Sequence, residues 1–322
     1  MDPVITFPML GGISFSFPSY FVLFGHAFYW YGVIIACGFL LAVWYCFSRC
    51  RQFGITQDDL LDTVLWGVPL GIVGARAYYV IFYGNYDTFW DMCKIWEGGL
   101  AIYGGVIAAT ITIFIVCRIK KISPFAMLDI TAFGLLIGQA VGRWGNFANR
   151  EAFGYETDIF CRMGLTYADG HTIYVHPCFL YESLWNAAGL LLLHILSKKT
   201  RRLFDGQYFL SYLGWYGLGR VWIEGLRTDS LYIGSIRVSQ LLAAVCVVAV
   251  AVIFLLKLKS GTCTPDRLFV NRVAAAEAAA ASAAEAGTDT PEDGSADPAE
   301  NDGTGEADIE VEIESLPEDD GE

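Results

Sequence analysis

Residues 237–257 read RVSQLLAAVCVVAVAVIFLLK, an apolar run that starts at an arginine and ends at a lysine. A helix needs about 20 mostly apolar residues to cross a bilayer core of roughly 30 Å, and this run has that length. Six further runs meet the same requirement, at 20–48, 60–84, 98–117, 124–142, 178–197 and 206–226. The sequence therefore predicts an all-α integral membrane protein with about seven transmembrane helices.

The composition agrees with a membrane protein. Of the 322 residues, 55% are apolar, 15% are aromatic and only 17% are charged, which is rare among soluble proteins. The net charge of −13 is misleading, because 17 of the 34 acids follow Arg272, where no Lys or Arg occurs. Residues 1–272 hold all 21 basic residues and carry a net charge of +4. Such a mildly basic body gives no reason to expect a nucleic-acid partner.

Lys and Arg residues are unevenly distributed between the two sides of the predicted spans. Thirteen of them follow the first, third, fifth and seventh spans, and six lie in the alternate loops. Cytoplasmic loops carry the excess of Lys and Arg, so we expect the N-terminus outside and the C-terminus in the cytoplasm. The opening residues MDPVITFPML lack the basic region and cleavage site of a signal peptide, and none is expected.

The chain divides into a membrane domain and a tail. We assign residues 1–260 to the membrane domain, which includes a small external cap at about 143–177, rich in Gly, Asn, Tyr and Asp. Residues 261–322 form an acidic cytoplasmic tail. Its AAAEAAAASAAEAG stretch predicts a short helix, and the remainder is too polar to fold.

Nine cysteines and four histidines occur singly, without a CxxC pair or metal-ligand spacing. We therefore expect neither a metal nor a cofactor. Cys93, Cys161 and Cys178 fall on the predicted outer side. A disulfide among these three is the alternative to free thiols, and the sequence leaves it open.

Ionisable residues within spans are costly and point to function. Arg76 follows the apolar run WGVPLGIVG, and Arg220 and Glu224 lie four residues apart on one helix face. Two interpretations of this pair stay open. Either Glu224 simply neutralises Arg220, or it orients an arginine whose free edge binds an anionic head group bidentately.

Residues 138–156, GQAVGRWGNFANREAFGYE, hold the densest group of polar side chains. Arg143, Asn146 and Glu151 follow the fourth span, with aromatic residues between them, and Gly154 permits a close backbone approach that a Cβ would block. This pattern favours a packed site at head-group depth over a solvated loop. Three earlier glycines recur every four residues and predict close helix packing: Gly134, Gly138 and Gly142.

Three shorter stretches complete the pattern. WEGGLAIYGGVI (96–107) predicts a helix start with tight packing, and FYWYG (28–32) predicts an interfacial aromatic belt. HPCFLYES (176–183) begins a span with a proline, which the first turn of a helix tolerates.

In this order, these stretches resemble the prolipoprotein diacylglyceryl transferase family over roughly residues 15–257. GRWGNFANREAFG (142–154) is similar to the family signature G-R-x-G-N-F-x-N-x-E-x-x-G. The resemblance implies transfer of the diacylglyceryl group of phosphatidylglycerol to the lipobox cysteine thiol of prolipoproteins, with release of glycerol 1-phosphate. It also implies a multi-pass protein of the bacterial plasma membrane, with the bilayer, the lipid and the prolipoprotein as partners.

The same resemblance implies roles for individual residues. Arg143 and Arg220 are implied to engage the lipid phosphate, with Glu224 and Glu151 holding the arginines in place. The other matches are implied to be catalytic (Tyr31 and Asn146) or to bind phosphatidylglycerol (Asn146, Gly154, Tyr103 and Arg76). Many family members carry a histidine where this chain has Tyr103. A tyrosine, with a pKa near 10, is a poor base, so the general base stays unassigned.

A transporter for an anionic solute is the rival interpretation, since it too needs arginines in interrupted helices. It would predict internal repeats, which we do not find in the sequence, and arginines near the bilayer midplane. Arg143 is instead expected at the outer edge of its span. A purely structural subunit leaves the costly arginines and the dense 143–156 segment without a purpose.

Overall fold

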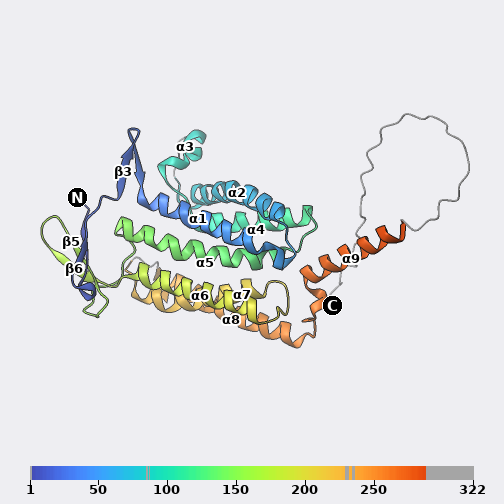
Figure 1. Ribbon diagram of the computed structural model, residues 1–322. Coiled ribbons are helices and arrows are strands. Elements are labelled where there is room, and N and C mark those ends of the chain that lie inside the picture. The colour runs from blue at the N-terminus through green and yellow to red at the C-terminus, as the bar shows by residue number, and fades with distance from the viewer. Residues whose placement is uncertain (1, 85, 87, 229–231, 234–235, 288–322) are drawn as a thin grey trace, which may run out of the picture. The chain divides into compact units, whose positions relative to one another are not determined.

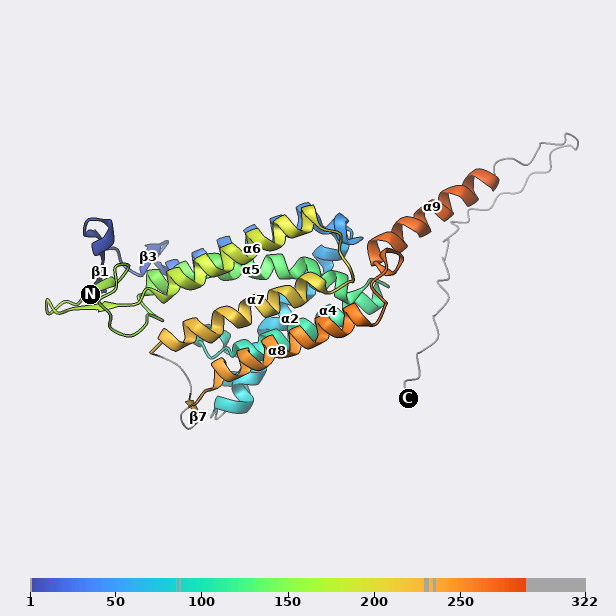
Figure 2. The ribbon, with the colours of Figure 1, turned by 90° about the horizontal axis from the view of Figure 1, so that it is seen from below.

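The computed structural model describes residues 2–84, 86, 88–228, 232–233 and 236–287. Residues 1–278 form one compact unit, to which the following description refers. Its long helices run side by side, and strands β1, β5 and β6 lie together at one end of them (Figure 1). Seen from below, the N-terminus and β1 lie at this same end (Figure 2).

Seven helices of the described chain make up the bundle. They are α1 (Trp30–Arg49), α2 (Gln57–Tyr83), α4 (Ile102–Ile119), α5 (Pro124–Asn149), α6 (Cys178–Lys199), α7 (Gln207–Ile223) and α8 (Val238–Lys259). Six are long and apolar enough to cross a membrane, which confirms a helical membrane protein. Helix α7 has only 17 residues and is not among the six, so a seventh crossing stays a prediction.

Shorter elements connect the bundle. Helix α3 spans Phe89–Cys93, β7 (Tyr232–Ile233) pairs with β8 (Ile236–Arg237), and 3-10 turns cover Pro8–Leu10, Cys50–Phe53, Ile95–Glu97, Glu224–Leu226 and Pro265–Arg267. Helix α9 (Phe269–Gly287) contains the helix predicted in the tail. The remainder of the tail, 288–322, lies outside the described residues.

A small antiparallel sheet joins the N-terminus to the predicted cap. Its strands are β1 (Val4–Phe7), β2 (Ile13–Phe15), β5 (Met163–Thr166) and β6 (Thr172–Val175), in the order β2-β1-β5-β6. Ile5, Leu165 and Val175 are buried in its core, against Phe179 at the start of α6. The cap is thus a packed layer at one end of the bundle.

The first membrane helix begins later than predicted. Residues 20–29, which the sequence placed in the span 20–48, form the hairpin of β3 (Tyr20–Leu23) and β4 (His26–Tyr29). Its two loop residues, Phe24 and Gly25, both have positive φ, 50° and 78°. That geometry defines a tight hairpin turn. The prediction was wrong here because a pair of strands rich in aromatic residues is as apolar as a membrane span.

Helix α5 is longer than the predicted span 124–142 and continues to Asn149. It starts at Ser123, whose side chain accepts a backbone N–H from the first turn. It ends at Arg150, which has the left-handed φ of 53°. Half of the most apolar 18-residue stretch of α5 is buried, the largest share among the six candidate spans. Arg143 therefore projects from a rigid helix rather than from a loop.

Asp129 of α5 holds the start of α7. Its side chain is fully buried, and its carboxylate accepts backbone N–H bonds from Gly206 (2.9 Å), Tyr208 (2.7 Å) and Phe209 (3.0 Å). These N–H groups are among those that a helix start leaves without partners. An acid on one helix thus caps its neighbour, which fixes how far α7 reaches toward the cap.

The predicted glycine packing is confirmed at two of three positions. A Cβ at Gly134 or Gly142 would lie 3.1 Å from a side chain of α1. A Cβ at Gly138 would have no atom of a neighbouring element within 4 Å, so the prediction of tight packing is wrong at this position. All nine cysteines lie within the described residues and are thiols rather than disulfides, which includes Cys93, Cys161 and Cys178.

Candidate active site

A single buried carboxylate brings three arginines together at the cap end of the bundle. Glu182, near the start of α6, is 3% exposed. Its Oε2 lies 2.7 Å from Nη2 of Arg143 on α5, and 3.7 Å from Nη1 of Arg220 on α7. Its Oε1 accepts a hydrogen bond of 2.9 Å from Nη1 of Arg227, just after α7. Guanidinium groups far apart in the sequence therefore converge on one point.

A second buried carboxylate supports the middle of this group. Glu224 is 3% exposed, and its Oε2 lies 2.8 Å from Nη2 of Arg220, as the spacing of four predicted. Ser239 of α8 donates a hydrogen bond of 2.8 Å to Oε1 of Glu224. Arg237 donates one of 2.7 Å to the backbone carbonyl of the same residue. Arg220 is thus fixed from two sides by acids on different helices.

We call Arg143, Arg220, Arg227, Glu182 and Glu224 the arginine cluster; its formal charge is +1. The side chains of Glu182 and Glu224 are almost fully buried, whereas those of Arg143 and Arg220 are 22% and 20% exposed. The carboxylates hence lie behind the guanidinium groups. A crevice between α6 and α7 reaches both Arg220 and Glu182. Such a group suits an anion that meets several N–H donors at once.

Asn146 and Glu151 pair with each other at the end of α5. Asn146, one helical turn beyond Arg143, donates a hydrogen bond of 3.0 Å to Glu151 Oε1, and Asn149 donates one of 3.3 Å to the same oxygen. We expected Glu151 to hold an arginine. Instead Glu182 does so for Arg143, and the exposed Glu151 is oriented by two amides.

Tyr31 and Gly154 shape the surroundings of the cluster. Tyr31, on the first turn of α1, lies against α5, where a Cβ at Gly145 would come within 2.7 Å of its ring. At Gly154 a Cβ would lie 2.6 Å from the carbonyl oxygen of Leu226. Gly154 also forms a β-bridge with Arg227. The predicted close approach is confirmed, and it positions the backbone of one cluster arginine.

Arg76 and Tyr103 belong to the other side of the bundle, on α2 and α4. The guanidinium of Arg76 donates to four backbone carbonyls of the connection between these helices: Asp91, Met92, Gly98 and Gly99. Tyr103 is half exposed, and its ring centroid lies 6.4 Å from that of Tyr78. The contacts of these two residues join neither of them to the arginine cluster.

Two cluster members escaped the analysis of the sequence. Glu182 lies in the quoted stretch HPCFLYES, and Arg227 ends GRVWIEGLR. The available signal for Glu182 was an acid just inside an apolar run, where an uncompensated charge is expensive. His176, two residues before the start of α6, has a pKa below its usual value because it is partly buried, and burial favours the neutral ring.

The fold and the cluster together define a class of protein: a multi-helix membrane protein that holds an excess of guanidinium groups over buried carboxylates, suited to an anionic ligand. Comparison with known sequences narrows this class. The family description "prolipoprotein diacylglyceryl transferase" matches residues 18–256, and the chain belongs to that family.

The alignments with its relatives cover most of the length of each relative. A protein of Lactobacillus delbrueckii subsp. bulgaricus is 44% identical over 237 residues, 70% of this chain and 85% of the relative. One from Enterococcus faecalis is 44% identical over 267 residues, 78% and 93% of the two chains. One from Limosilactobacillus reuteri is 42% identical over 243 residues, 71% and 86%. Each is named phosphatidylglycerol–prolipoprotein diacylglyceryl transferase. The chain is thus an enzyme of the transferase class.

Proposed function

We propose that this chain transfers the diacylglyceryl group of phosphatidylglycerol to the lipobox cysteine of prolipoproteins, the first step of lipoprotein maturation. Family membership supports the reaction. The observation that carries the assignment of the site is the meeting of Arg143 and Arg220 on Glu182, with both guanidinium groups partly open to a ligand.

The arginine cluster fits the charge that this reaction develops. The cysteine thiolate attacks the glyceryl carbon that bears the phosphate ester, a thioether forms, and glycerol 1-phosphate leaves. Negative charge grows on the phosphate oxygen as the carbon–oxygen bond breaks. Donors that are already fixed where this charge appears stabilise the transition state most. Arg143 and Arg220 take this role, and the two buried acids keep them from reorganising.

The neighbouring residues complete the assignment. Asn146 lies on the same face of α5 as Arg143 and supplies a neutral donor to the head group. Glu151, exposed and oriented by amides, is our candidate to take the thiol proton. Tyr31 bounds the site from α1, and Gly154 acts by letting the backbone of Arg227 approach. For Arg76 and Tyr103 we propose a supporting role on the α2–α4 side rather than contact with phosphate.

We further propose that the protein crosses the bacterial plasma membrane seven times, with its N-terminus outside. The last turns of α1, α4, α6 and α8 carry basic residues, and all four helices lead away from the cap. The positive-inside rule then places those ends in the cytoplasm and the arginine cluster near the outer leaflet. That is where a secreted precursor presents its cysteine.

The test is a transfer assay with the purified chain in detergent, radiolabelled phosphatidylglycerol and a lipobox peptide. We expect a thioether-linked diacylglyceryl peptide from the unaltered chain. Arg143→Ala and Arg220→Ala should each lower the rate by about 100-fold or more, the cost of removing a fixed donor to developing charge.

Arg162→Ala is the matched control, because Arg162 lies in the cap and bonds to the carbonyl of Asp158 instead. It should keep the rate within about twofold. Absence of thioether product from a folded, unaltered chain would refute the proposed function, and unchanged rates in both cluster variants would refute the assigned site.

A further inference from the structure

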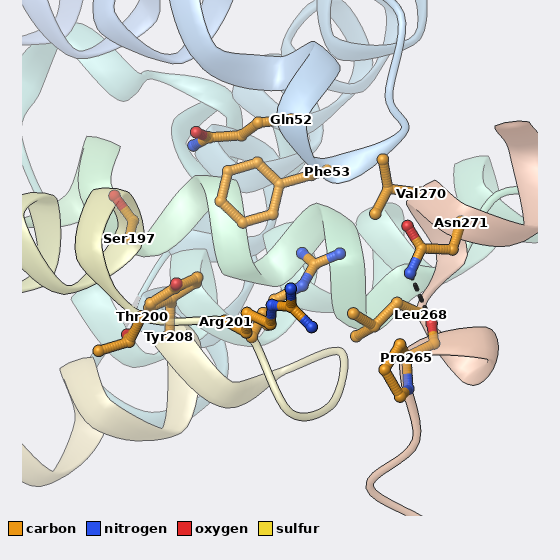
Figure 3. Close-up of a pocket in the computed structure, with 11 residues that line it drawn as sticks. Gln52, Phe53, Ser197, Thr200, Arg201, Tyr208, Pro265, Leu268, Val270 and Asn271 are labelled. Atoms are coloured by element: carbon orange, nitrogen blue, oxygen red, sulfur yellow. Dashed lines mark hydrogen bonds between the residues drawn. The ribbon is translucent and has the colours of Figure 1, made fainter.

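Two features of the described chain lie outside the proposed reaction, a cavity and a hairpin. The cavity has a volume of about 360 Å³ and lies between the end of α1, the connection from α6 to α7 and residues 265–271. Figure 3 shows the side chains that line it, among them Arg201. Arg202 pairs with Asp129 and Asp205, at 3.5 and 3.1 Å. Because the charge of Arg202 is balanced within the protein, the hairpin is the feature that calls for a partner.

The hairpin of β3 and β4, residues 20–29, points sideways from the start of α1. In Figure 1 it runs across the direction of the long helices, on the side of the bundle where α3 also projects. The backbone N–H of Trp30 donates a hydrogen bond of 3.0 Å to the carbonyl of Ser19, and the N–H of Ser19 donates one of 2.8 Å to Asp2. The base of the hairpin is therefore fixed, and the remainder extends away from it.

Both faces of the hairpin are apolar and exposed. Residues 20–29 include no Lys, Arg, Asp or Glu. Six of these ten residues are large, apolar and at least 43% exposed: Tyr20, Val22, Leu23, Phe24, Phe28 and Tyr29. Phe24, in the turn, reaches 91%. A two-stranded hairpin is marginally stable at best in water, and an exposed apolar patch marks a contact surface. The hairpin therefore needs an apolar partner.

The surface of the hairpin continues the surface of a membrane helix. Helix α1 begins at Trp30, directly after β4, and its exposed side chains include Leu40 at 64% and Trp44 at 70%. Apolar side chains of this kind contact lipid where a helix crosses a bilayer. Since the long helices cross the membrane, a hairpin that runs across them lies in the plane of the membrane, at the level where α1 begins. The bilayer is thus the partner that this geometry favours.

The depth of the hairpin follows from its backbone and its aromatic residues. Two strands leave two open edges of N–H and C=O groups, which the hydrocarbon core does not tolerate. Water and lipid head groups satisfy such edges at the interface. Tyr20 and Tyr29, whose ring centroids lie 5.7 Å apart at the base of the hairpin, and the neighbouring Trp30 are of the residue types that gather at this level. Both features indicate the interface rather than the core.

Helix α3 has the same character on the same side of the bundle. Phe89 and Trp90 are 69% and 76% exposed, and Trp96, in the 3-10 turn after the helix, is 76% exposed. Asp91 and Lys94 pair with each other at 2.6 Å and add charged groups. Aromatic residues combined with charged ones are typical of segments that lie in the interface. Two separate segments thus indicate the same level.

We propose that the β3–β4 hairpin lies in the outer-leaflet interface of the bilayer and that phospholipid covers its two faces, with Phe24 in contact with acyl chains. This inference rests on the proposed orientation, with the cap outside, and not on the proposed chemistry. Bound in this way, the hairpin holds the start of α1 at the level of the head groups. Tyr31, on that first turn, then bounds the site at the depth where phosphatidylglycerol presents its phosphate.

Photocrosslinking in vesicles tests this contact. The full chain carrying Phe24→p-benzoylphenylalanine is reconstituted into vesicles of phosphatidylcholine that is radiolabelled in its acyl chains. The matched control is Phe160→p-benzoylphenylalanine, because Phe160 is 78% exposed and lies in the cap, on the same side of the membrane. Illumination should attach at least about fivefold more lipid to the Phe24 variant, since an aromatic side chain at the interface meets lipid and one in the cap meets water.

Folding and the reaction are checked separately. Both variants should keep the melting temperature of the unaltered chain and a transfer rate within about twofold, because exposed positions away from the arginine cluster tolerate substitution. If the unaltered chain were inactive in transfer, the melting temperature would still show that the variants fold, and the labelling would decide the lipid contact. Equal labelling at the two positions, or a cross-link from the Phe24 variant to a second copy of the chain in place of lipid, would overturn the proposal.

Discussion

Arg76 and Arg220 both lie on helices of the bundle, and the structure uses them in opposite ways. On the α2–α4 side, Arg76 is 7% exposed and donates hydrogen bonds of 2.7 to 3.1 Å to backbone carbonyls. On the α6–α7 side, Arg220 is 20% exposed and is held from behind by Glu182 and Glu224.

The difference shows what an arginine needs in order to serve a ligand. Backbone carbonyls accept from Arg76 in four hydrogen bonds, which use four of the five N–H groups of its guanidinium, so Arg76 holds the 91–99 connection in place. Carboxylates on one side cancel the cost of burial while the other edge stays open. Arg150 repeats the first pattern, since it donates to carbonyls of Pro3, Phe17 and Ala148 and so ties the N-terminus to the cap.

The largest expected effect separates these two kinds of arginine. Arg220→Gln should lower the transfer rate per folded molecule by about 100-fold, because a fixed donor is lost from the site. Its melting temperature should fall as well, because the buried Glu224 loses its partner. Arg76→Gln should lower the melting temperature by several degrees, because hydrogen bonds from a buried charge are lost. Calorimetry measures the melting temperature of each variant, and the transfer assay measures its rate per folded molecule. Unchanged stability in Arg76→Gln would break the comparison.

Removal of the central acid should come next in size. Glu182→Gln leaves three guanidinium groups without their shared partner, and we expect a loss of transfer of about 10-fold to 100-fold, since breaking a buried pair by removing one partner is strongly unfavourable. Glu156→Gln, at an exposed acid of the cap, serves as the control. A fully active Glu182→Gln protein would mean that the arginines hold their places without it.

A smaller loss should follow from crowding the backbone behind Arg227. Gly154→Ala puts a Cβ about 2.6 Å from the Leu226 carbonyl, so the chain must shift. Overpacking of this kind typically costs about 1–3 kcal/mol. We expect the melting temperature to fall and transfer to drop about 10-fold. Gly138→Ala, where the space is open, is the matched control and should behave like the unaltered chain.

The smallest effect is expected on the α2–α4 side. Tyr103→Phe removes a hydroxyl from a half-exposed side chain whose ring contact, with Tyr78, lies outside the arginine cluster. The initial rate of transfer should stay within about twofold. A complete loss in a folded protein would give that hydroxyl a chemical role and bring this side of the bundle into the site.

The sequence predicted those parts of the site that depend on local spacing. Arg220 and Glu224 are neighbours on one helix, so their pairing follows from a separation of four residues. The meeting of Arg143 with Glu182 depends instead on how α5 packs against α6, which no local pattern encodes. The carbonyls that occupy Arg76 are equally invisible, because every residue carries one and only the fold selects which of them converge.

The same limit, that local patterns do not encode how elements pack, explains the errors in the predicted fold. Apolar runs gave the positions of the membrane helices, because the bilayer imposes a length and a composition. The hairpin at residues 20–29 has the apolar composition of a span, and its strand pairing around the turn at Phe24 and Gly25 is visible only in the structure. The extension of α5 to Asn149 likewise carries polar residues that composition alone assigns to a loop.

The account depends on Arg143 and Arg220 acting on one phosphate, and a double-mutant cycle on kcat/KM tests this most directly. Groups that act as a unit are strongly non-additive in their kinetic effects. We predict that Arg143→Gln and Arg220→Gln each lower kcat/KM by about 100-fold, and that the combined change adds less than about 10-fold to the larger single loss. Losses that multiply, as for independent sites, would contradict the account.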